Sequence, residues 1–341
     1  MTVGYLWPPL YKKRTDFHRV MSGVAAMRGI ELFHFFSTKS INFDDKTILG
    51  NVWSVRLGRF VRKPMPFPDI IQDVTVPIDS KARDRLRRAG VLTTWVNLGG
   101  KIKIDNILTN SQLEKYTLKT YSLQKTSIEQ LLDEHETVIA KPLQGMLGGG
   151  VHKFTKSNYG IFMHLRNERR AITSQQLHEK EEELRAKNYI AQEFFDSRTK
   201  AGNPFDVKIY TIRGGGNGEW THLTMLPRVG AAEGLVSNVG QAGNALLFPE
   251  NFLRTELGDV WEGVYDELKK LAKDVPVVLE KEYKRPLTTI GIDVGIERKN
   301  NTVKLFEANS TIYMTPHKME MFEAHINQWK WLYNHHKRME S

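Results

Sequence analysis

Two consecutive segments near the C-terminal end constrain the fold of this chain more strongly than any other part of its sequence. Residues 287–297 read LTTIGIDVGIE, and residues 301–310 read NTVKLFEANS. In the first segment every second residue from Ile290 to Ile296 is apolar, and the other face carries Asp293 between two glycines. Period-two alternation predicts β-strands, and the polar RKNN between the segments predicts a turn. We therefore expect a β-hairpin.

This hairpin brings acidic side chains together. A tight turn places Asp293 opposite Glu307 or within one residue of it, and Asn309 shares the face of Glu307. Two neighbouring carboxylates repel each other unless a cation lies between them, and Mg²⁺ prefers oxygen ligands that it can bridge to substrate phosphates. The pattern therefore predicts a magnesium site at these three residues. A solvated hairpin face is the alternative, which the surrounding apolar residues disfavour.

A lysine and a glycine-rich run form a second feature. Residues 137–151 read TVIAKPLQGMLGGGV, in which Lys141 closes a short apolar run and precedes the glycines. Backbone N–H groups of such a loop can approach an anion closely, and the lysine adds positive charge. Neither G-x-x-x-x-G-K-[ST] nor G-x-G-x-x-G is present. We expect a mobile lid over phosphates with Lys141 beneath it, and a flexible surface turn is the alternative.

The remaining sequence predicts a mixed α/β protein. Its first ~110 residues begin as strand, helix and strand, and the helix is expected to turn one apolar side inward: Phe17, Val20, Met21, Val24 and Met27. Further helices are predicted at 80–89 before Gly90, 110–123, 173–187, within 260–283, and at the C-terminal end around Met319, Phe322, Ile326 and Trp329. Further strands are predicted at 189–195 and in a hairpin of 206–212 with 219–226.

Composition limits the chemistry. The 341 residues include no cysteine, which excludes disulfides and thiolate catalysis, and 40% are hydrophobic, enough for two or three packed units. We find neither an apolar run near the ~18–20 residues of a membrane span nor a secretory signal, and expect a soluble, cytoplasmic protein. The formal charge of +10 favours an acidic substrate. The basic runs lack a nucleic-acid pattern, so we expect neither nucleic acid nor membrane as a partner.

The strand lysine, the glycine run and the Asp…Glu-x-Asn hairpin together resemble the ATP-grasp superfamily. Within it, the chain resembles the YheC/YheD family of proteins associated with bacterial endospore coats, and more distantly glutathione synthetase. The resemblance covers about residues 109–316 and implies an α/β fold of the α+β ATP-grasp type, with nucleotide held between two subdomains. The implied division is a pre-ATP-grasp α/β domain at 1–108, a small subdomain with the lid at 109–190, and a large subdomain with the hairpin at 191–341.

The resemblance also implies roles for individual residues. LEKYTLKTYSL is similar to a stretch with a nucleotide-contacting lysine, VIAKPLQGMLGGGV resembles the strand lysine and lid, and YIAQEFF resembles the hinge strand. The implied nucleotide-binding residues are Lys115, Lys141, Gly148, Gly149, Gly150, the backbone at Glu193, Phe194 and Phe195, and Asp206 near the ribose. The implied catalytic residues are Lys208, Arg228 and Asn238, and the implied ligands of Mg²⁺, with Mn²⁺ as an alternative, are Asp293, Glu307 and Asn309.

One position departs from the family pattern, which expects arginine where this chain has Lys208. The substitution keeps the positive charge but loses the planar fork that binds two oxygens at once. The departure therefore bears on how the phosphates are held and on catalytic competence.

The activity that the resemblance implies is an ATP-dependent ligase that joins a carboxylate to an amine or a thiol through an acyl phosphate and releases ADP and phosphate. Amide formation by a carboxylate–amine ligase is favoured. Positioning and charge neutralisation would supply the catalysis, which suits a chain without cysteine. The implied substrates are small-molecule or peptide carboxylates and amines. Two alternatives stay open: an ATP-binding scaffold protein of a spore coat, and a kinase on the same fold. A homodimer and a spore-coat association also stay open.

Overall fold

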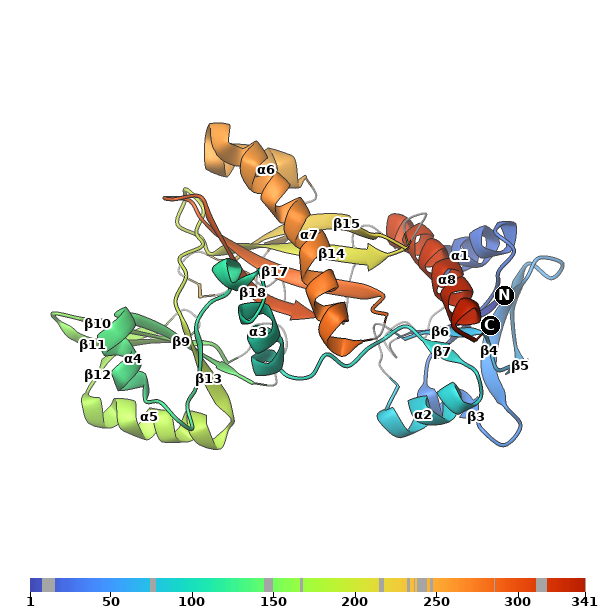
Figure 1. Cartoon of the computed structure of the whole chain (residues 1–341), viewed down its shortest axis with the longest axis horizontal. Coiled ribbons are helices and arrows are strands. Elements are labelled where there is room, and N and C mark those ends of the chain that lie inside the picture. Colours follow the sequence, from blue (N-terminus) through green and yellow to red (C-terminus); the bar gives the residue numbers. More distant parts are fainter. Residues whose placement is uncertain are drawn as a thin grey trace.

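The chain folds around three β-sheets that follow one another in sequence. The computed structural model describes residues 1–7, 16–73, 78–143, 150–165, 168–214, 218–231, 234–235, 237, 244–245, 248–284, 286–310 and 318–340. Within these residues the sheets have seven, six and five strands. Figure 1 shows the third sheet in the middle, between the second and the first.

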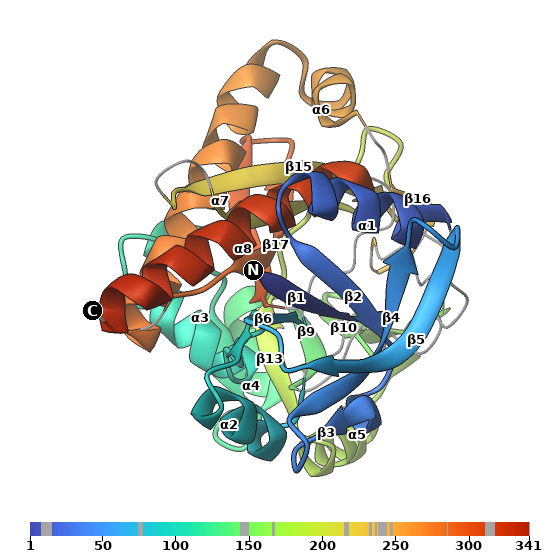
Figure 2. The ribbon, with the colours of Figure 1, turned by 90° about the vertical axis from the view of Figure 1, so that its right-hand side faces the viewer.

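The first sheet begins with the predicted strand, helix and strand. β1 (Thr2–Leu6) pairs in parallel with β2 (Glu31–Phe35), and α1 (Asp16–Met27) connects them. The sheet continues with β3 (Ile41–Asn42), β4 (Thr47–Ser54), β5 (Arg59–Pro66), β6 (Ile70–Gln72) and β7 (Leu92–Thr93), in the order β3-β4-β2-β1-β6-β7 with β5 on β4. α1 and the C-terminal helix α8 (Lys318–Glu340) pack on one face, and α2 (Ser80–Arg88) packs on the other (Figure 2).

The buried face of α1 matches the predicted one in part, because Phe17 and Val24 pack partly buried against the core as expected. Met21 is buried as expected, but 43% of Val20 and 86% of Met27 are exposed. The polar residues His18 and Ser22 are buried instead. The burial of Ser22 has a physical reason, because its Oγ lies 3.0 Å from the Nε2 of the buried His34 on β2, and the ring of His18 packs edge to face against Trp7. Buried polar groups that satisfy each other compete with apolar residues for an interior position.

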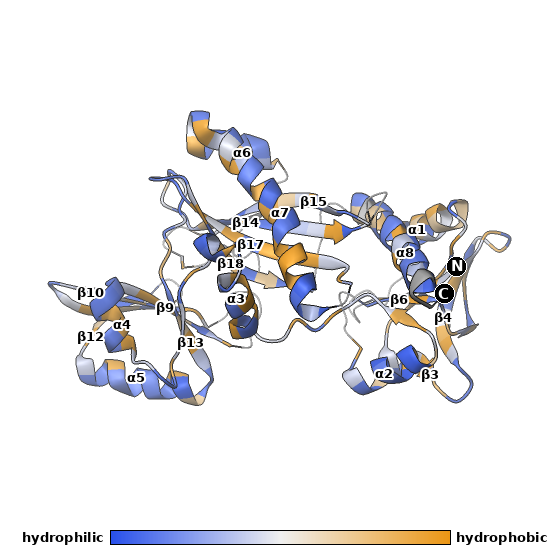
Figure 3. Ribbon diagram, viewed as in Figure 1, coloured by the Kyte–Doolittle hydropathy of each residue, from blue (hydrophilic) through white to orange (hydrophobic). Residues whose placement is uncertain are grey.

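The second sheet carries the predicted strand lysine. Its strands are β8 (Thr120–Ser122), β9 (Thr137–Pro142), β10 (His152–Ser157), β11 (Gly160–Leu165), β12 (Glu168–Ile172) and β13 (Tyr189–Glu193), in the order β12-β11-β10-β9-β13-β8. α4 (Ile128–His135) and α5 (Ser174–Ala186) contribute to its core. Figure 3 shows α5 as largely hydrophilic, and its inward contacts include Leu177 and Leu184.

The third sheet contains both predicted hairpins. Its strands are β14 (Phe205–Arg213), β15 (Trp220–Val229), β16 (Asn244–Ala245), β17 (Thr289–Glu297) and β18 (Thr302–Asn309), in the order β16-β15-β14-β17-β18. β14 pairs with β15 and β17 with β18, both antiparallel, which confirms both hairpins. α3 (Lys101–Thr109) and α7 (Trp261–Tyr283) pack against this sheet, with α6 (Pro249–Leu257) beside α7.

The segment before the second sheet corrects one predicted helix. Residues 110–123 were predicted to be helical, but they form only the short 3-10 helix η3 (Glu114–Tyr116) and then β8. Tertiary contacts override the local preference here, because Leu113 and Tyr116 pack into the core of the third sheet and Thr120–Ser122 pair with β13. The helix of this region lies earlier in the chain, at α3.

The segments that pack together in one apolar core are not always neighbours in the sequence. Residues from Val96 to Tyr116 pack in the core of the third sheet, whereas Phe322 and Trp329 of α8 pack in the core of the first. The domain bounds after residues 108 and 190 stay predictions. No helix among the described residues is both long enough and apolar enough to cross a membrane.

Candidate functional site

Three adjacent strands of the third sheet carry predicted phosphate and metal residues in a single row. Lys208 on β14 is the register partner of Asp293 on β17, and Asp293 is the register partner of Glu307 on β18. The predicted pairing of Asp293 with Glu307 is therefore confirmed. Directly opposed residues of antiparallel strands project from the same face, so the row places one ammonium beside two carboxylates.

Four charged side chains form a buried network around Asp293. The Nζ of Lys208 lies 2.9 Å from Oδ1 of Asp293, and the Nη2 of Arg228 lies 2.8 Å from the same oxygen. Arg228 also donates two hydrogen bonds to Asp206, of 2.6 Å from Nε and 2.5 Å from Nη2. Burial alone would raise the pKa of Asp293, but Lys208 and Arg228 outweigh it and hold that pKa below its ordinary value. Asp293 is therefore an ionised carboxylate at neutral pH.

Glu307 completes the row at the edge strand and lacks such compensation. Burial raises the pKa of Glu307, and the charge of Asp293 raises it further, while Lys101 is the strongest opposing charge. Asn309 lies two residues further along β18, as the register partner of Gly291. Two carboxylates and an amide are the hard oxygen donors that Mg²⁺ prefers, and a cation would relieve the repulsion between the carboxylates. The residues present therefore fit the ion.

Two glycines on β17 make the space that these side chains occupy. A Cβ at Gly291 would lie 3.0 Å from Cε of Lys208 and 3.2 Å from Oδ1 of Asn309. A Cβ at Gly295 would lie 2.2 Å from the ring of Phe306, so that ring can rest on β17 only because residue 295 has no side chain. The Phe306 ring also meets Phe195 edge to face, with centroids 6.1 Å apart.

Lys141 reaches this sheet from the neighbouring one. Its Nζ donates a 2.8 Å hydrogen bond to Oε1 of Gln192 on β13 and a 3.4 Å hydrogen bond to the carbonyl of Phe306 on β18. Burial lowers the pKa of Lys141, and the charge of Asp105 opposes this most strongly, followed among the acids by Glu307 and Asp293. Lys141 thus places positive charge against the acidic end of the row, and its predicted contact with phosphates stays a prediction.

Lys101 is a candidate binding residue that the sequence reasoning missed. It begins α3, and its Nζ donates a 3.3 Å hydrogen bond to the carbonyl of Pro142, the residue after Lys141. It also lines a cavity of about 410 Å³ together with Glu307 and Asn309. The other lining residues are Trp95, Asn97, Leu98, Gly99, Gly100, Ile104, Leu143, Ala308 and Ser310. Ile104 and Leu108 are buried and lie four residues apart, a spacing that indicates a helix. This spacing is the sequence signal that could have located the helix that begins at Lys101.

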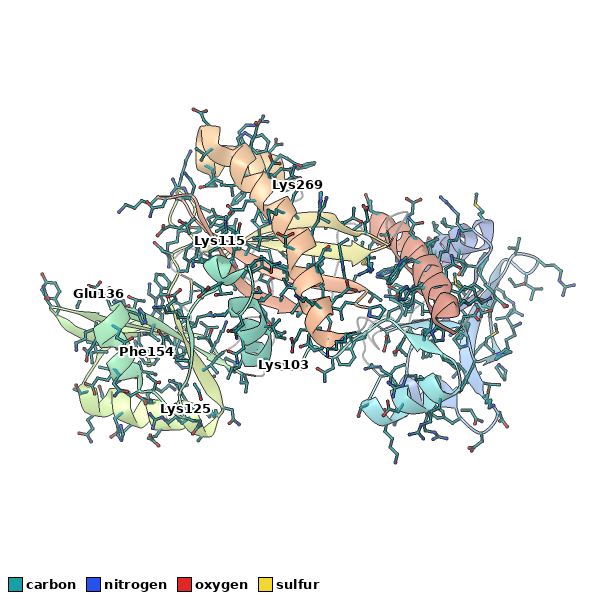
Figure 4. The ribbon with its side chains drawn as sticks, in the orientation of Figure 1. Lys103, Lys115, Lys125, Glu136, Phe154 and Lys269 are labelled. Atoms are coloured by element: carbon teal, nitrogen blue, oxygen red, sulfur yellow. The ribbon has the colours of Figure 1, made fainter. Side chains whose placement is uncertain are left out.

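Lys115, the lysine predicted from this part of the chain, lies elsewhere. It is exposed on η3, beside the third sheet (Figure 4). Its Nζ lies over the ring of Tyr116, 4.6 Å from the ring centroid. The hydroxyl of Tyr116 donates a 2.8 Å hydrogen bond to Glu267 of α7. The structure therefore brings Lys101, and not the ammonium of Lys115, to the charged row.

The predicted hinge and lid residues are only partly described. Glu193 ends β13, and its N–H donates to the carbonyl of Lys119. The Nζ of Lys153 lies over the ring of Phe194, 3.7 Å from the ring centroid. Gly150 has φ of +77°, and a Cβ there would lie 2.5 Å from the hydroxyl of Tyr189. Gly148, Gly149 and Asn238 lie outside the described residues.

A row of acids and lysines at the meeting of two sheets is the arrangement that the family resemblance predicts, and comparison with known proteins decides the family. The model of the YheC/D-like ATP-grasp family matches residues 93–329. This chain belongs to that family. The match includes the second and third sheets and every described residue of the charged row.

Individual relatives of this ATP-grasp protein are distant. The endospore coat-associated protein YheD of Bacillus subtilis (strain 168) is 23% identical over 296 residues, which cover 81% of this chain and 63% of YheD. The chain thus spans less than two thirds of the length of that relative.

Solved structures share the fold of this ATP-grasp protein at low identity. D-alanine–D-alanine ligase from Bacillus anthracis, complexed with ATP, has a TM-score of 0.53 at 10% identity and full coverage of both chains. D-cycloserine synthetase DcsG has a TM-score of 0.54 at 7% identity, covering 96% of this chain and 99% of its own. D-alanyl-alanine synthetase A from Vibrio cholerae has 0.53 at 12%, covering 97% and 98%. The predicted ATP-grasp fold is confirmed, and these structures with the same fold are ligases and synthetases.

Proposed function

We propose that this protein is an ATP- and Mg²⁺-dependent ligase that joins a carboxylate to an amine through an acyl phosphate, releasing ADP and phosphate. The observation that carries the proposal is the row of Lys208, Asp293 and Glu307, which Lys101 and Lys141 approach from α3 and β9. The lysines can bind phosphate oxygens and the two acids can bind a metal ion, and all of them lie close together in a partly buried region. A chain without cysteine has no thiol nucleophile to offer, and this chemistry requires none.

The reaction needs two bond exchanges. A carboxylate oxygen of the substrate attacks the γ-phosphorus of ATP, the bond from that phosphorus to the bridging oxygen breaks, and ADP leaves with the electron pair. The amine nitrogen then attacks the acyl carbon and loses a proton, and inorganic phosphate leaves. Hydroxide would be a very poor leaving group without the first step, so the nucleotide supplies the driving force.

The residues of the chain would act by binding and charge neutralisation. Lys101, Lys141 and Lys208 are proposed to hold phosphate oxygens, with Arg228 beside the developing negative charge of the acyl phosphate. Asp293, Glu307 and Asn309 would hold Mg²⁺, which neutralises phosphate charge when bound. The glycine-rich lid and Asn238 are proposed to close over the reacting groups and exclude water.

The hinge would place the adenine ring. Phe195 and Phe306 meet edge to face beside the end of β13, which supports an apolar slot for a base at the backbone of Glu193 to Phe195. Asp206 is proposed to lie near the ribose. Its two hydrogen bonds to Arg228 also fix that guanidinium beside Asp293.

A trapping experiment tests the proposal without knowledge of the amine. The protein is incubated with ATP, Mg²⁺ and a panel of amino acids and short acidic peptides, with hydroxylamine in place of the second substrate. The expected result is substrate-stimulated ADP release together with a hydroxamate identified by mass spectrometry. A stable phosphorylated product without hydroxamate would instead indicate a kinase.

A second candidate is an ATP-binding scaffold of a spore coat. Two observations favour it: Asp293 is already paired with Lys208 and Arg228, and the relative YheD is named as endospore coat-associated. Under this proposal the protein binds nucleotide, but no carboxylate of the panel stimulates ADP release. Nucleotide titrations run beside the trapping experiment separate the two candidates.

A further inference from the structure

A chain of hydrogen bonds runs from Lys141 to an acid on α3. Lys141 Nζ donates to Oε1 of Gln192 at 2.8 Å, Nε2 of Gln192 donates to Oγ1 of Thr120 at 2.9 Å, and Oγ1 of Thr120 donates to Oδ2 of Asp105 at 2.9 Å. Every link points the same way, from an ammonium to a carboxylate. Reversing the amide of Gln192 would set its NH₂ group against the ammonium, so the charged ends fix its orientation.

This relay connects two parts of the fold. Lys141, Gln192 and Thr120 belong to β9, β13 and β8 of the second sheet. Asp105 belongs to α3, whose residues Ile104 and Leu108 pack in the core of the third sheet. The relay therefore links the second sheet to a helix that packs on the third, and the bond from Lys141 to the carbonyl of Phe306 links the two sheets a second time.

Asp105 also places a negative charge near two lysines of the site. Lys141 and Lys101 both act on it electrostatically, and Lys101 lies four residues before it on α3, one turn away. Among the acids near Lys141, Asp105 has the largest electrostatic effect on the pKa of that lysine, which it raises. None of the phosphate or metal roles proposed above uses Asp105, Thr120 or Gln192.

We propose that Asp105, Thr120 and Gln192 are positioning residues for nucleotide binding, which hold the ammonium of Lys141 at the phosphate site and tie it to α3. The inference rests on the proposed function. A flexible lysine side chain loses rotamer freedom when it binds phosphate, and a relay that fixes it beforehand reduces this loss. Losing one link leaves a polar group unpaired and the ammonium free to turn away.

Thr120→Val tests the relay, because valine keeps the shape of threonine and removes only its hydroxyl. We expect roughly tenfold weaker ADP binding by calorimetry, the size of losing one hydrogen bond in a chain that ends on charged groups. Thr120→Ser retains the hydroxyl and should restore binding. Thr137→Val is the matched control, because Thr137 is a strand residue of the same sheet with a hydroxyl hydrogen bond to Thr155. That variant should bind ADP like the wild type.

A double-mutant cycle separates positioning from a general structural effect. If Thr120 acts through Lys141, adding Thr120→Val to Lys141→Ala should cause no further loss of ADP affinity. Equal losses in both backgrounds, or wild-type affinity of Thr120→Val, would overturn the inference. The readout is ADP binding and not turnover, so the relay can fail while the ligase proposal stands. A wild-type protein that binds no ADP would overturn both.

Discussion

The Nζ of Lys208 lies 2.9 Å from Oδ1 of Asp293, so the residue that replaces the family's arginine makes an ion pair with a predicted metal ligand. Both side chains are largely buried, with 8% and 12% exposed. Arg228 contacts the same oxygen. Asp293 therefore meets two cations before any metal binds, and the function of the site depends on whether Lys208 can leave Asp293 to contact phosphate.

Variants of Lys208 measure this directly. An ammonium neutralises one phosphoryl oxygen but cannot bind two oxygens in parallel. If the site is a ligase adapted to lysine, Lys208→Ala should lower turnover by roughly 10²–10³-fold, the usual range for losing one preorganised donor to developing charge. Lys208→Arg should retain part of the activity, because the positive charge returns even if the longer guanidinium fits imperfectly. Steady-state kinetics are compared with Lys299→Ala, a control lysine in the exposed turn between β17 and β18. Full activity of Lys208→Ala would contradict the catalytic role assigned to Lys208.

Glu307→Gln tests the metal site. An amide cannot supply the anionic oxygen that offsets the charge of Mg²⁺, so we expect Mg²⁺-dependent turnover to be abolished. Burial makes the charge of Glu307 unfavourable in the folded protein, and the neutral amide removes that charge, so the unfolding midpoint of the variant without Mg²⁺ should equal or exceed that of the wild type.

Thermal unfolding with and without Mg²⁺ and ADP measures this second effect. Glu297→Gln is the matched control, because Glu297 belongs to the same hairpin and accepts a hydrogen bond from Asn300 at its turn. Loss of stability in Glu307→Gln without Mg²⁺, or turnover equal to the wild type, would contradict the assignment of Glu307.

Much of the third sheet could be predicted because its strands carry strong local patterns. The alternation around Asp293 and the short turn before β18 determine the register that sets Asp293 against Glu307. The contacts that complete the site are different in kind. The carbonyl of Pro142 is 41 residues from Lys101, and Gln192 is a neutral side chain whose importance depends on its neighbours. Local patterns carry no information about such long-range pairs, so the sequence gives no sign that Lys101 approaches Glu307, and the nucleotide-binding role of Lys115 stays a prediction.

We expect alanine variants of Lys101 and Lys115 to differ in their affinity for ADP. Lys101→Ala should weaken ADP binding by roughly tenfold, because it removes a cation from the cavity shared with Glu307 and Asn309. Lys115→Ala should change the affinity by less than about twofold, because exposed charges away from a site contribute little. Calorimetric titration of both variants tests the pair. A larger loss in Lys115→Ala than in Lys101→Ala would show that η3 approaches the nucleotide in the bound state.

The first sheet makes a separate prediction about acid stability. Trp7 donates a 3.0 Å hydrogen bond to Nδ1 of His34, and Oγ of Ser22 lies 3.0 Å from its Nε2. Burial, with a contribution from the nearby His18, lowers the pKa of His34 from 6.5 to about 3. Between about pH 3 and pH 6.5, His34 is therefore protonated in the unfolded chain but neutral in the folded chain. The stabilising contribution is complete above pH 6.5 and is lost as the pH falls toward 3.

Urea unfolding between pH 7.5 and 4.5 measures this contribution. Over that range His34 should account for a fall of about 1.4 kcal/mol in unfolding free energy per pH unit below 6.5. His34→Gln keeps an acceptor for Trp7 and a donor for Ser22 but does not titrate. The variant should have a lower free energy of unfolding than the wild type at pH 7.5. Below pH 6.5 its free energy of unfolding should fall less steeply, by about 1.4 kcal/mol per pH unit. His178→Gln, an exposed control on α5, should keep the wild-type slope. An undiminished decline in His34→Gln would mean that other groups carry the acid sensitivity and that His34 is not held neutral by the fold.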